Sequence, residues 1–336
     1  MSLWWANREQ LDPHQVSLIE ELPLLGNYLV TGPPGSGKTN VLLRRAQFVR
    51  LQEMPNILVL TFTRALAEFV RTGCYNDGRE IFPPALVTTL ESWLRSIYKT
   101  YGLELPANQK DQNARRAEMA AGVLSVAQGG QLPRYDAIFV DEAQDLMKEE
   151  LAVLQAYSDN LFFVGDDRQK IYGGAAGLQA VRSLVPAPSE HLLPFHYRLV
   201  REICLMADRI QVATGVTSLA ATQHYVGPTP GRISAEGPLA RAAQIAAASA
   251  RLRDQVRVYE DLIQQGDRLG VIVPRRDDRE EVFKIFEQDP NLSGRSQVVR
   301  ARDGTAEDRS FQTSIDTTKP ILILTAQGES RHTLFA

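Results

Sequence analysis

The chain has 336 residues, of which 37 are lysine or arginine and 40 are aspartate or glutamate, so its formal net charge is −3. Hydrophobic residues make up 44% and charged residues 23%, which is ordinary for a globular protein of about two domains and argues against a disordered or fibrous chain. The charge balance excludes a basic field over the whole surface, so a nucleic-acid site would have to be a local stripe of arginine.

The sequence gives no sign of secretion or of a membrane span. The amino-terminal residues lack a basic region followed by an apolar core, and no stretch of about 18 apolar residues is present. Cys74 and Cys204 lie far apart and form no metal or redox spacing, and the histidines form no zinc pattern. We therefore expect a cytoplasmic protein that does not bind membranes.

The first predicted element is a helix over residues 10–26, because Asp12 and Pro13 supply a cap followed by proline in the first turn. Gln15 lies near its start. An exposed helical glutamine is usually solvated, and the residues alone favour that interpretation. The alternative is that its amide reads an adenine edge, since it offers both a donor and an acceptor.

A phosphate-binding motif follows the apolar run 28–31 and precedes a helical pattern. The motif Gly-x4-Gly-Lys-Ser/Thr is matched at every required position by Gly32-Pro33-Pro34-Gly35-Ser36-Gly37-Lys38-Thr39. Its glycines let backbone N–H groups converge on one anion, Lys38 brings a charge to the β- and γ-phosphates, and Thr39 can ligate Mg²⁺. The strand before and the helix after disfavour a chance match. The motif predicts binding of a nucleoside triphosphate with Mg²⁺.

Two further apolar runs, 57–61 and 85–88, are typical of strands buried in a parallel sheet. The first ends in Phe62-Thr63-Arg64 and a helix from 65 to about 71, and the second leads into Thr89 and another helix. Residues 100–133 are polar and helical in part. We expect a small insertion over about 95–135 instead of a separate domain.

The run 137–140 ends in Asp141-Glu142-Ala143-Gln144-Asp145. A strand end of this kind faces the ligand in an open α/β sheet. Asp141 would hold Mg²⁺ through its water shell, and Glu142 would orient and deprotonate the attacking water. A solvated acidic turn is the alternative, and a phosphate-binding loop about a hundred residues upstream disfavours it.

The run 161–165 repeats the pattern of a strand followed by acidic residues, and Gln169 and Tyr172 come next. The amide of Gln169 can hydrogen-bond a γ-phosphate and so report whether the triphosphate is intact. Tyr172 could stack on a base, although a tyrosine in this setting is more often part of a core.

A domain boundary is predicted at Pro186-Ala187-Pro188, which gives a first α/β domain at 1–188 and a second at 189–336. Strand-like and helical segments alternate beyond it, which implies a second parallel α/β domain without a phosphate-binding loop of its own. The expected strands are 231–233, 269–273, 297–299 and 321–325, and the expected helices are 239–265 and 278–287.

Taken in this order, the segments resemble the superfamily 1 helicases of the UvrD/Rep/PcrA type over nearly the whole chain. The phosphate-binding loop and the Asp-Glu-x-Gln-Asp sequence are the most specific parts of the resemblance. It implies two RecA-like P-loop NTPase domains with ATP and Mg²⁺ between them. It also implies translocation along DNA with 3′-to-5′ polarity.

The resemblance assigns roles to single residues as well. Gln15 falls at the family's adenine-reading glutamine. Tyr197 matches the tyrosine that stacks on adenine, and Arg198 matches the arginine that reaches the γ-phosphate from the second domain. Gly328 lies in a weakened form of a late nucleotide motif. The residues that resemble the family's strand-contact motifs are Thr61, Phe62, Thr63, Arg64, Thr89 and Tyr172.

The sequence also departs from the family. It stops soon after the late motif, so the second domain is expected to be incomplete and the last motif, with its second arginine finger, is absent. The expected partners are single-stranded or tailed duplex DNA, and a protein or further segment that supplies this arginine. Three hypotheses stay open: a DNA-dependent ATPase that translocates, a nucleotide-gated binding subunit that does not unwind, and a metabolic P-loop kinase. The last is disfavoured because we find no acceptor site.

Overall fold

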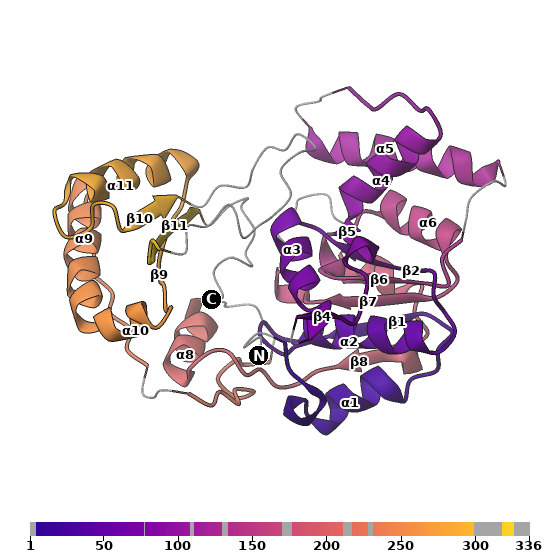
Figure 1. Cartoon of the computed structure of the whole chain (residues 1–336), viewed down its shortest axis with the longest axis horizontal. Helices are drawn as coiled ribbons and strands as arrows, with labels where there is room; N and C mark the ends of the chain where they lie inside the picture. The colour runs from indigo at the N-terminus through magenta and orange to yellow at the C-terminus, as the bar shows by residue number, and fades with distance from the viewer. Residues whose placement is uncertain are drawn as a thin grey trace. The chain divides into compact units, whose positions relative to one another are not determined.

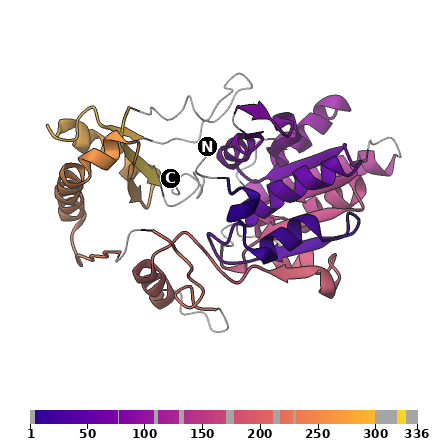
Figure 2. The ribbon, with the colours of Figure 1, turned by 60° about the horizontal axis from the view of Figure 1, so that its bottom comes forward.

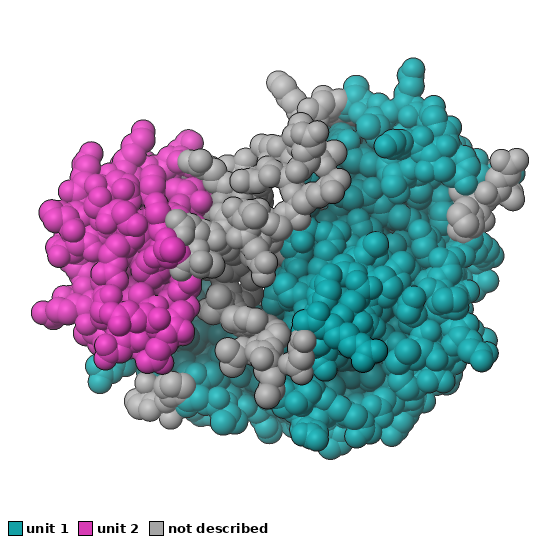
Figure 3. Space-filling model, in the orientation of Figure 1, with its two compact units in different colours: residues 1–233 teal, residues 234–336 magenta. Residues whose placement is uncertain are grey.

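The computed structural model describes residues 5–76, 78–107, 111–129, 134–169, 177–210, 217–227, 231–298 and 318–325. The chain divides into two compact units, Met1–Ile233 and Ser234–Ala336, which are coloured separately in Figure 3. The division therefore falls after Ile233 and not after residue 188. The physical reason is that the segment after the prolines returns to the first sheet, where it adds an edge strand.

The first unit is built on a six-stranded sheet in the order β5-β2-β6-β7-β1-β8, and every neighbouring pair is parallel (Figure 1). Its strands are β1 (Tyr28–Thr31), β2 (Ile57–Thr61), β5 (Val87–Thr89), β6 (Ala137–Val140), β7 (Leu161–Gly165) and β8 (Glu190–Leu192). The continuous apolar runs β1, β2, β6 and β7 are buried along their whole length, as expected for parallel strands covered on both faces. Because all six strands run in one direction, their carboxyl ends lie on the same edge of the sheet.

Helices cover both faces of this sheet (Figures 1 and 2), and alternate strand residues point into two separate cores. In β2, Leu58 and Leu60 join the core made with α4 to α7, whereas Ile57 and Val59 join the core made with α1 to α3. The helices of this unit are α1 (Pro13–Glu20), α2 (Lys38–Leu51), α3 (Arg64–Thr72), α4 (Leu90–Thr100), α5 (Gln112–Gln128), α6 (Lys148–Tyr157), α7 (Leu178–Arg182) and α8 (Arg201–Ile210). A short hairpin of β3 (Tyr75–Asn76) and β4 (Arg79–Glu80) follows α3.

The predicted insertion contributes helix α5, which is part of the first unit's core. Met119 and Val123 are buried in the same core as α4, and the hydroxyl group of Tyr98 donates to the carbonyl of Met119 at 3.2 Å. The first helix is shorter than predicted. Asp12 caps α1 at its start, and the helix ends at Glu20, just before Pro23.

The second unit contains a three-stranded parallel sheet in the order β10-β11-β9. Its elements are α9 (Arg241–Val258), α10 (Glu260–Gln264), β9 (Leu269–Val273), α11 (Arg276–Gln288), β10 (Ser296–Val298) and β11 (Ile321–Thr325). Val256 of α9 and Phe286 of α11 pack with Ile323 of β11 in one core. The single helix expected over 239–265 is interrupted at Tyr259, whose φ of −106° and ψ of 17° are not helical. Residues 231–233, expected as a strand, belong to no regular element.

These sheets confirm the predicted α/β class, with two parallel sheets flanked by helices as expected of RecA-like domains. Both cysteines are buried and form no disulfide with each other. Within the described parts of the chain, no helix is both long and apolar enough to cross a membrane.

Candidate nucleotide and nucleic-acid site

The carboxyl edge of the first sheet gathers the motifs that the sequence singles out. The residues expected to contact the phosphates and Mg²⁺ follow the four adjacent strands β6, β7, β1 and β8. The predicted strand contacts from Thr61 to Arg64 and at Thr89 lie at the ends of β2 and β5. The two groups meet where β2 pairs with β6. Segments far apart in the sequence thus form one continuous row along the edge of one sheet, which is where ligands bind in open α/β folds.

The glycines of the phosphate-binding loop are required by the local geometry. Gly35 and Gly37 have φ of 81° and 84°, in the left-handed region that other residues rarely adopt. A Cβ on Gly32 would lie 2.8 Å from the carbonyl oxygen of Leu193, and one on Gly37 would lie 2.6 Å from the side-chain nitrogen of Gln15. The loop can therefore follow this path only with glycine at these positions.

Lys38 begins helix α2 and turns its side chain back over the loop. Its Nζ donates to the carbonyl oxygens of Gly32 at 2.8 Å and of Pro33 at 3.0 Å. Burial lowers the pKa of Lys38, and the nearby carboxylates, Asp166 first among them, oppose that shift. The ammonium group is therefore held inside the loop, at the position where a bound phosphate would need it.

Thr39 and Asp141 lie in direct contact. The Thr39 hydroxyl donates to Oδ2 of Asp141 at 2.8 Å, and the backbone N–H of Glu142 donates to Oδ1 at 2.9 Å. Among the described residues there is no group of three or more His, Cys, Asp or Glu side chains that could hold a metal. Mg²⁺ does not need one, because it keeps several waters and binds one or two carboxylates together with substrate phosphates. A hydroxyl and a carboxylate in contact beside the loop fit that ion.

Glu142 has a φ of 53°, which is uncommon for a residue other than glycine and is a feature of functional sites. Its carboxylate accepts a 2.6 Å hydrogen bond from the amide nitrogen of Gln144. The amide oxygen of Gln144 in turn accepts from the backbone N–H of Asp166 at 3.1 Å. Gln144 therefore fixes the Glu142 carboxylate and joins the tip of β6 to the tip of β7, a role that its place in the acidic motif did not reveal.

Asp166, like Gln144, was not among the predicted site residues. In the sequence it was only part of a repeated pattern, a strand followed by acidic residues. It is buried, its Oδ1 accepts from the backbone N–H of Arg168 at 3.0 Å, and its Oδ2 has no hydrogen-bond partner among the described residues. Burial raises the pKa of Asp166, and the positive charge of Lys38 acts in the opposite direction. A buried carboxylate is costly, and the nearby ammonium group of Lys38 offsets part of that cost.

Tyr197 and Arg198 lie against the phosphate-binding loop within the first unit. The backbone N–H of Tyr197 donates to the carbonyl of Gly35 at 3.1 Å, and its hydroxyl donates to Oδ2 of Asp12 at 2.7 Å. Burial, together with Asp12, raises the pKa of Tyr197 to about 12. A Cβ on Gly35 would lie 2.8 Å from the Cβ of Arg198. The expectation that Arg198 belongs to the second domain is therefore wrong, because β8 carries this segment back to the first sheet.

Gln15 is buried, so the interpretation of it as a solvated residue is wrong. Its amide nitrogen donates to the carbonyl of Ser36 at 2.9 Å, and its amide oxygen accepts from the backbone N–H of Asp12 at 3.1 Å. The side chain thus connects the start of α1 to the phosphate-binding loop, and both ends of its amide have partners within the protein.

The threonines of the predicted strand contacts have local partners. The Thr63 hydroxyl accepts from the backbone N–H of Leu66 at 3.2 Å and caps α3, and Thr89 caps α4 in the same way by accepting from Ser92 at 3.1 Å. The buried Thr61 donates to the carbonyl of Thr63 at 3.1 Å. These hydroxyls position the ends of β2 and β5.

The remaining predicted residues differ in how they are placed. Phe62 is half-buried, with the guanidinium group of Arg116 5.2 Å from its ring centroid, and Arg64 is exposed. Gln169 ends a short 3₁₀ helix, Asp167–Gln169, that follows β7. Tyr172 and Gly328 lie outside the described residues.

Comparison with known proteins gives one family match. A family model described as an AAA domain (AAA_19) matches residues 19–175, a span that contains the phosphate-binding loop and the Asp141-Glu142 pair. No curated protein matches the chain. Similar solved structures include the helicase of PRRSV, at 14% identity and a TM-score of 0.38, with 90% of this chain and 52% of that chain covered. They also include UvsW of T4, at 10% identity and a TM-score of 0.34. That match covers 96% of this chain and 58% of UvsW. The chain thus spans between half and two thirds of the length of these two structures.

Proposed function

We propose that the protein is an ATP-dependent motor or clamp of the superfamily 1 helicase type, which hydrolyses ATP and thereby changes its hold on a single strand of DNA. One observation carries this proposal. The phosphate-binding loop, the Thr39–Asp141 contact and Glu142 share one sheet edge with the segments after β2 and β5 that are expected to contact the strand.

In this proposal the backbone of the loop from Gly32 to Gly37 and the ammonium group of Lys38 bind the phosphates. Thr39 and Asp141 would hold Mg²⁺, which would supply positive charge to neutralise the phosphates. The residues proposed to shape the loop and the adenine side of the site are Gln15, Pro33, Pro34, Gly35, Ser36, Tyr197 and Gly328.

Glu142 is proposed to orient the attacking water and accept its proton, and Gln144 keeps the carboxylate in place through the 2.6 Å hydrogen bond. Arg198 is proposed to stabilise charge on the γ-phosphate. Arginines with this role contribute on the order of 10³–10⁵ in rate. Gln169, at the end of the 3₁₀ helix after β7, would respond to the presence of the γ-phosphate.

The strand is proposed to lie over the ends of β2 and β5. Phe62 and Tyr172 would stack on bases, at about 1–3 kcal/mol per base. Phosphate contacts near Thr61, Thr63, Arg64 and Thr89 would make binding depend on salt. The second α/β unit, and a partner or segment with a further arginine, would complete the motor.

The test is an ATPase assay with and without single-stranded DNA, with Lys38→Ala as the inactive control. We expect DNA to raise the hydrolysis rate of the wild-type chain, and Lys38→Ala to abolish hydrolysis under both conditions. A wild-type rate that DNA leaves unchanged would contradict the proposal. Strand separation on a tailed duplex then distinguishes a motor from a clamp.

A further inference from the structure

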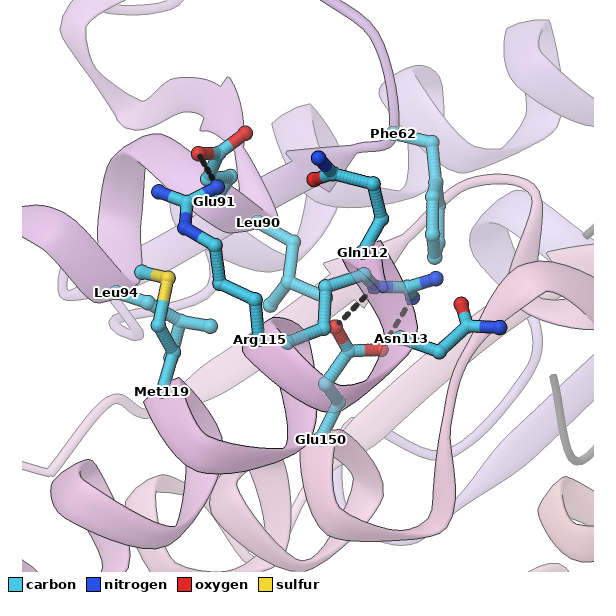
Figure 4. A pocket seen from close by; sticks show the side chains of 10 residues that line it. Phe62, Leu90, Glu91, Leu94, Gln112, Asn113, Arg115, Met119 and Glu150 are labelled. Atoms are coloured by element: carbon cyan, nitrogen blue, oxygen red, sulfur yellow. Dashed lines mark hydrogen bonds and ion pairs between the residues drawn. The ribbon is translucent and has the colours of Figure 1, made fainter. Parts of the chain in front are cut away.

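A pocket lies in the first unit beside the residues expected to contact the strand (Figure 4). Its volume is about 220 Å³, enough for several water molecules or for one planar base. Phe62 comes from the segment after β2, Leu90 and Leu94 come from α4, and Met119 comes from α5. The end of β2, the start of α4 and the insertion helix therefore build the pocket together.

The charged residues that line this pocket are two arginines and two glutamates, and they form two ion pairs. Arg116 donates to both carboxylate oxygens of Glu150, at 2.9 and 2.6 Å, and Arg115 lies 3.4 Å from Glu91. Each arginine of the lining thus has a carboxylate partner, and Glu91 is shared, since it also pairs with Arg95 at 2.9 Å. Such a lining favours a neutral ligand over a phosphate group, which prefers unbalanced arginine.

The other lining residues suit a flat ring with polar edges. Phe62, Leu90, Leu94 and Met119 offer an apolar surface, and Gln112 at the start of α5, with its neighbour Asn113, adds amide groups that can both donate and accept. In Figure 4 the ring of Phe62 forms one side of the pocket, and the side chain of Gln112 extends toward the same space. A nucleobase has two apolar faces and an edge of donors and acceptors, so it matches both parts of this lining.

We infer that the pocket takes one nucleobase of the bound strand, turned out from its neighbours, with its face toward Phe62 and its edge toward Gln112 and Asn113. The inference rests on the proposed function and goes further, since it assigns a base-binding role to the insertion helix α5. Arg116 also donates to the carbonyl of Asp145 at 2.9 Å. One arginine therefore contacts both the Phe62 ring and the acidic motif that contains Glu142.

The experiment measures the affinity of a fluorescent single-stranded oligonucleotide by anisotropy, with one abasic nucleotide moved along the strand position by position. Besides any position at which Tyr172 stacks, we expect one position at which loss of the base weakens binding to the wild-type chain by about 5- to 150-fold, the equivalent of about 1–3 kcal/mol. Leu94→Phe, which adds volume to an apolar residue of the lining, should remove that positional penalty. Gln112→Ala should reduce it, and Gln179→Ala, an exposed glutamine on α7 outside the pocket, should leave it unchanged.

The outcomes separate this inference from the proposal on which it rests. A strand that binds without a positional penalty, or whose penalties all survive both pocket variants, would overturn the pocket assignment and leave the proposed function standing. An oligonucleotide that does not bind at all would overturn both. Gln112 is exposed, so Gln112→Ala decides the question even if Leu94→Phe fails to fold, which a thermal melt would reveal.

Discussion

The hydroxyl group of Thr39 donates a hydrogen bond of 2.8 Å to Oδ2 of Asp141, a residue 102 positions later in the chain. One residue lies in the first turn of α2, and the other directly follows β6. Parallel strands bring these two positions to the same edge, although β7 lies between β1 and β6. The contact joins the two motifs that the sequence identifies most specifically.

Replacement of Thr39 tests this contact. Thr39→Ala removes one of the two proposed Mg²⁺ ligands, so we expect Mg²⁺-dependent binding of a non-hydrolysable ATP analogue to weaken by at least about tenfold, or about 1.4 kcal/mol. Calorimetric titration with Mg²⁺ and with a chelator measures the difference. Thr39→Ser keeps the hydroxyl and is the matched control. Equal Mg²⁺ dependence in all three proteins would place the ion elsewhere.

Glu142 is tested by Glu142→Gln, which keeps the size of the side chain and removes the proton acceptor. We expect hydrolysis to fall by about 10²–10⁴, the usual contribution of a general base, while ATP affinity stays within about twofold. Glu149→Gln alters an exposed carboxylate on α6 and should leave both quantities unchanged. A normal rate of hydrolysis in Glu142→Gln would rule out the proposed base.

Asp166 predicts a stability effect that depends on pH. Its folded-state pKa is raised, so its contribution to stability is complete at pH values below the unfolded pKa of about 3.9 and is lost as the pH rises through the raised folded value. Asp166→Asn should therefore increase the free energy of unfolding at neutral pH by about 1 kcal/mol, because it removes the cost of the buried charge. The increase should disappear toward pH 4.

Denaturant unfolding of the nucleotide-free protein at neutral and at acid pH measures this difference. An increase of equal size at both pH values would show that packing, and not the carboxylate charge, separates the variant from the wild type.

Loss of one partner of the Arg116–Glu150 ion pair should lower the free energy of unfolding considerably. The Glu150 side chain is only 2% exposed, so Arg116→Met would leave a buried carboxylate without its partner, and the free energy of unfolding should fall by about 3–5 kcal/mol. The double variant Arg116→Met, Glu150→Met should recover most of that loss.

The exposed pair Arg134–Asp159 supplies the control, since its side chains are 52% and 82% exposed. Arg134→Met should change the free energy of unfolding by less than about 1 kcal/mol. Similar losses in Arg116→Met and Arg134→Met would contradict the assignment of the first pair to the interior.

Much of the first sheet could be predicted because its strands are continuous apolar runs that end in glycine, threonine or acidic residues. The other parts of the fold, such as strand β8, depend on contacts between segments that are distant in the sequence. Strand β8 is three residues long, includes glutamate and histidine, and is only partly buried, so only its pairing with β1 reveals it. That pairing also places Arg198 in the first unit.

The burial of Gln15 could not be predicted from the pattern of its own helix. Its amide has space only because Gly37, in the distant phosphate-binding loop, lacks a side chain. Nor could the pocket beside Phe62 be foreseen, since its walls come from α4, α5 and α6 as well as from the end of β2. Local patterns identified the residues that we propose to carry chemistry, whereas the partners of those residues required the fold.

The most direct test of the account compares the affinity of Glu142→Gln for a single-stranded oligonucleotide with and without ATP and Mg²⁺, measured by fluorescence anisotropy. This variant should bind ATP without hydrolysing it. The comparison therefore isolates the coupling between the proposed nucleotide site and the proposed strand-binding site. We predict that ATP changes the affinity by about 5-fold or more, which corresponds to a coupling free energy of at least about 1 kcal/mol. An affinity that saturating ATP leaves unchanged would contradict the account.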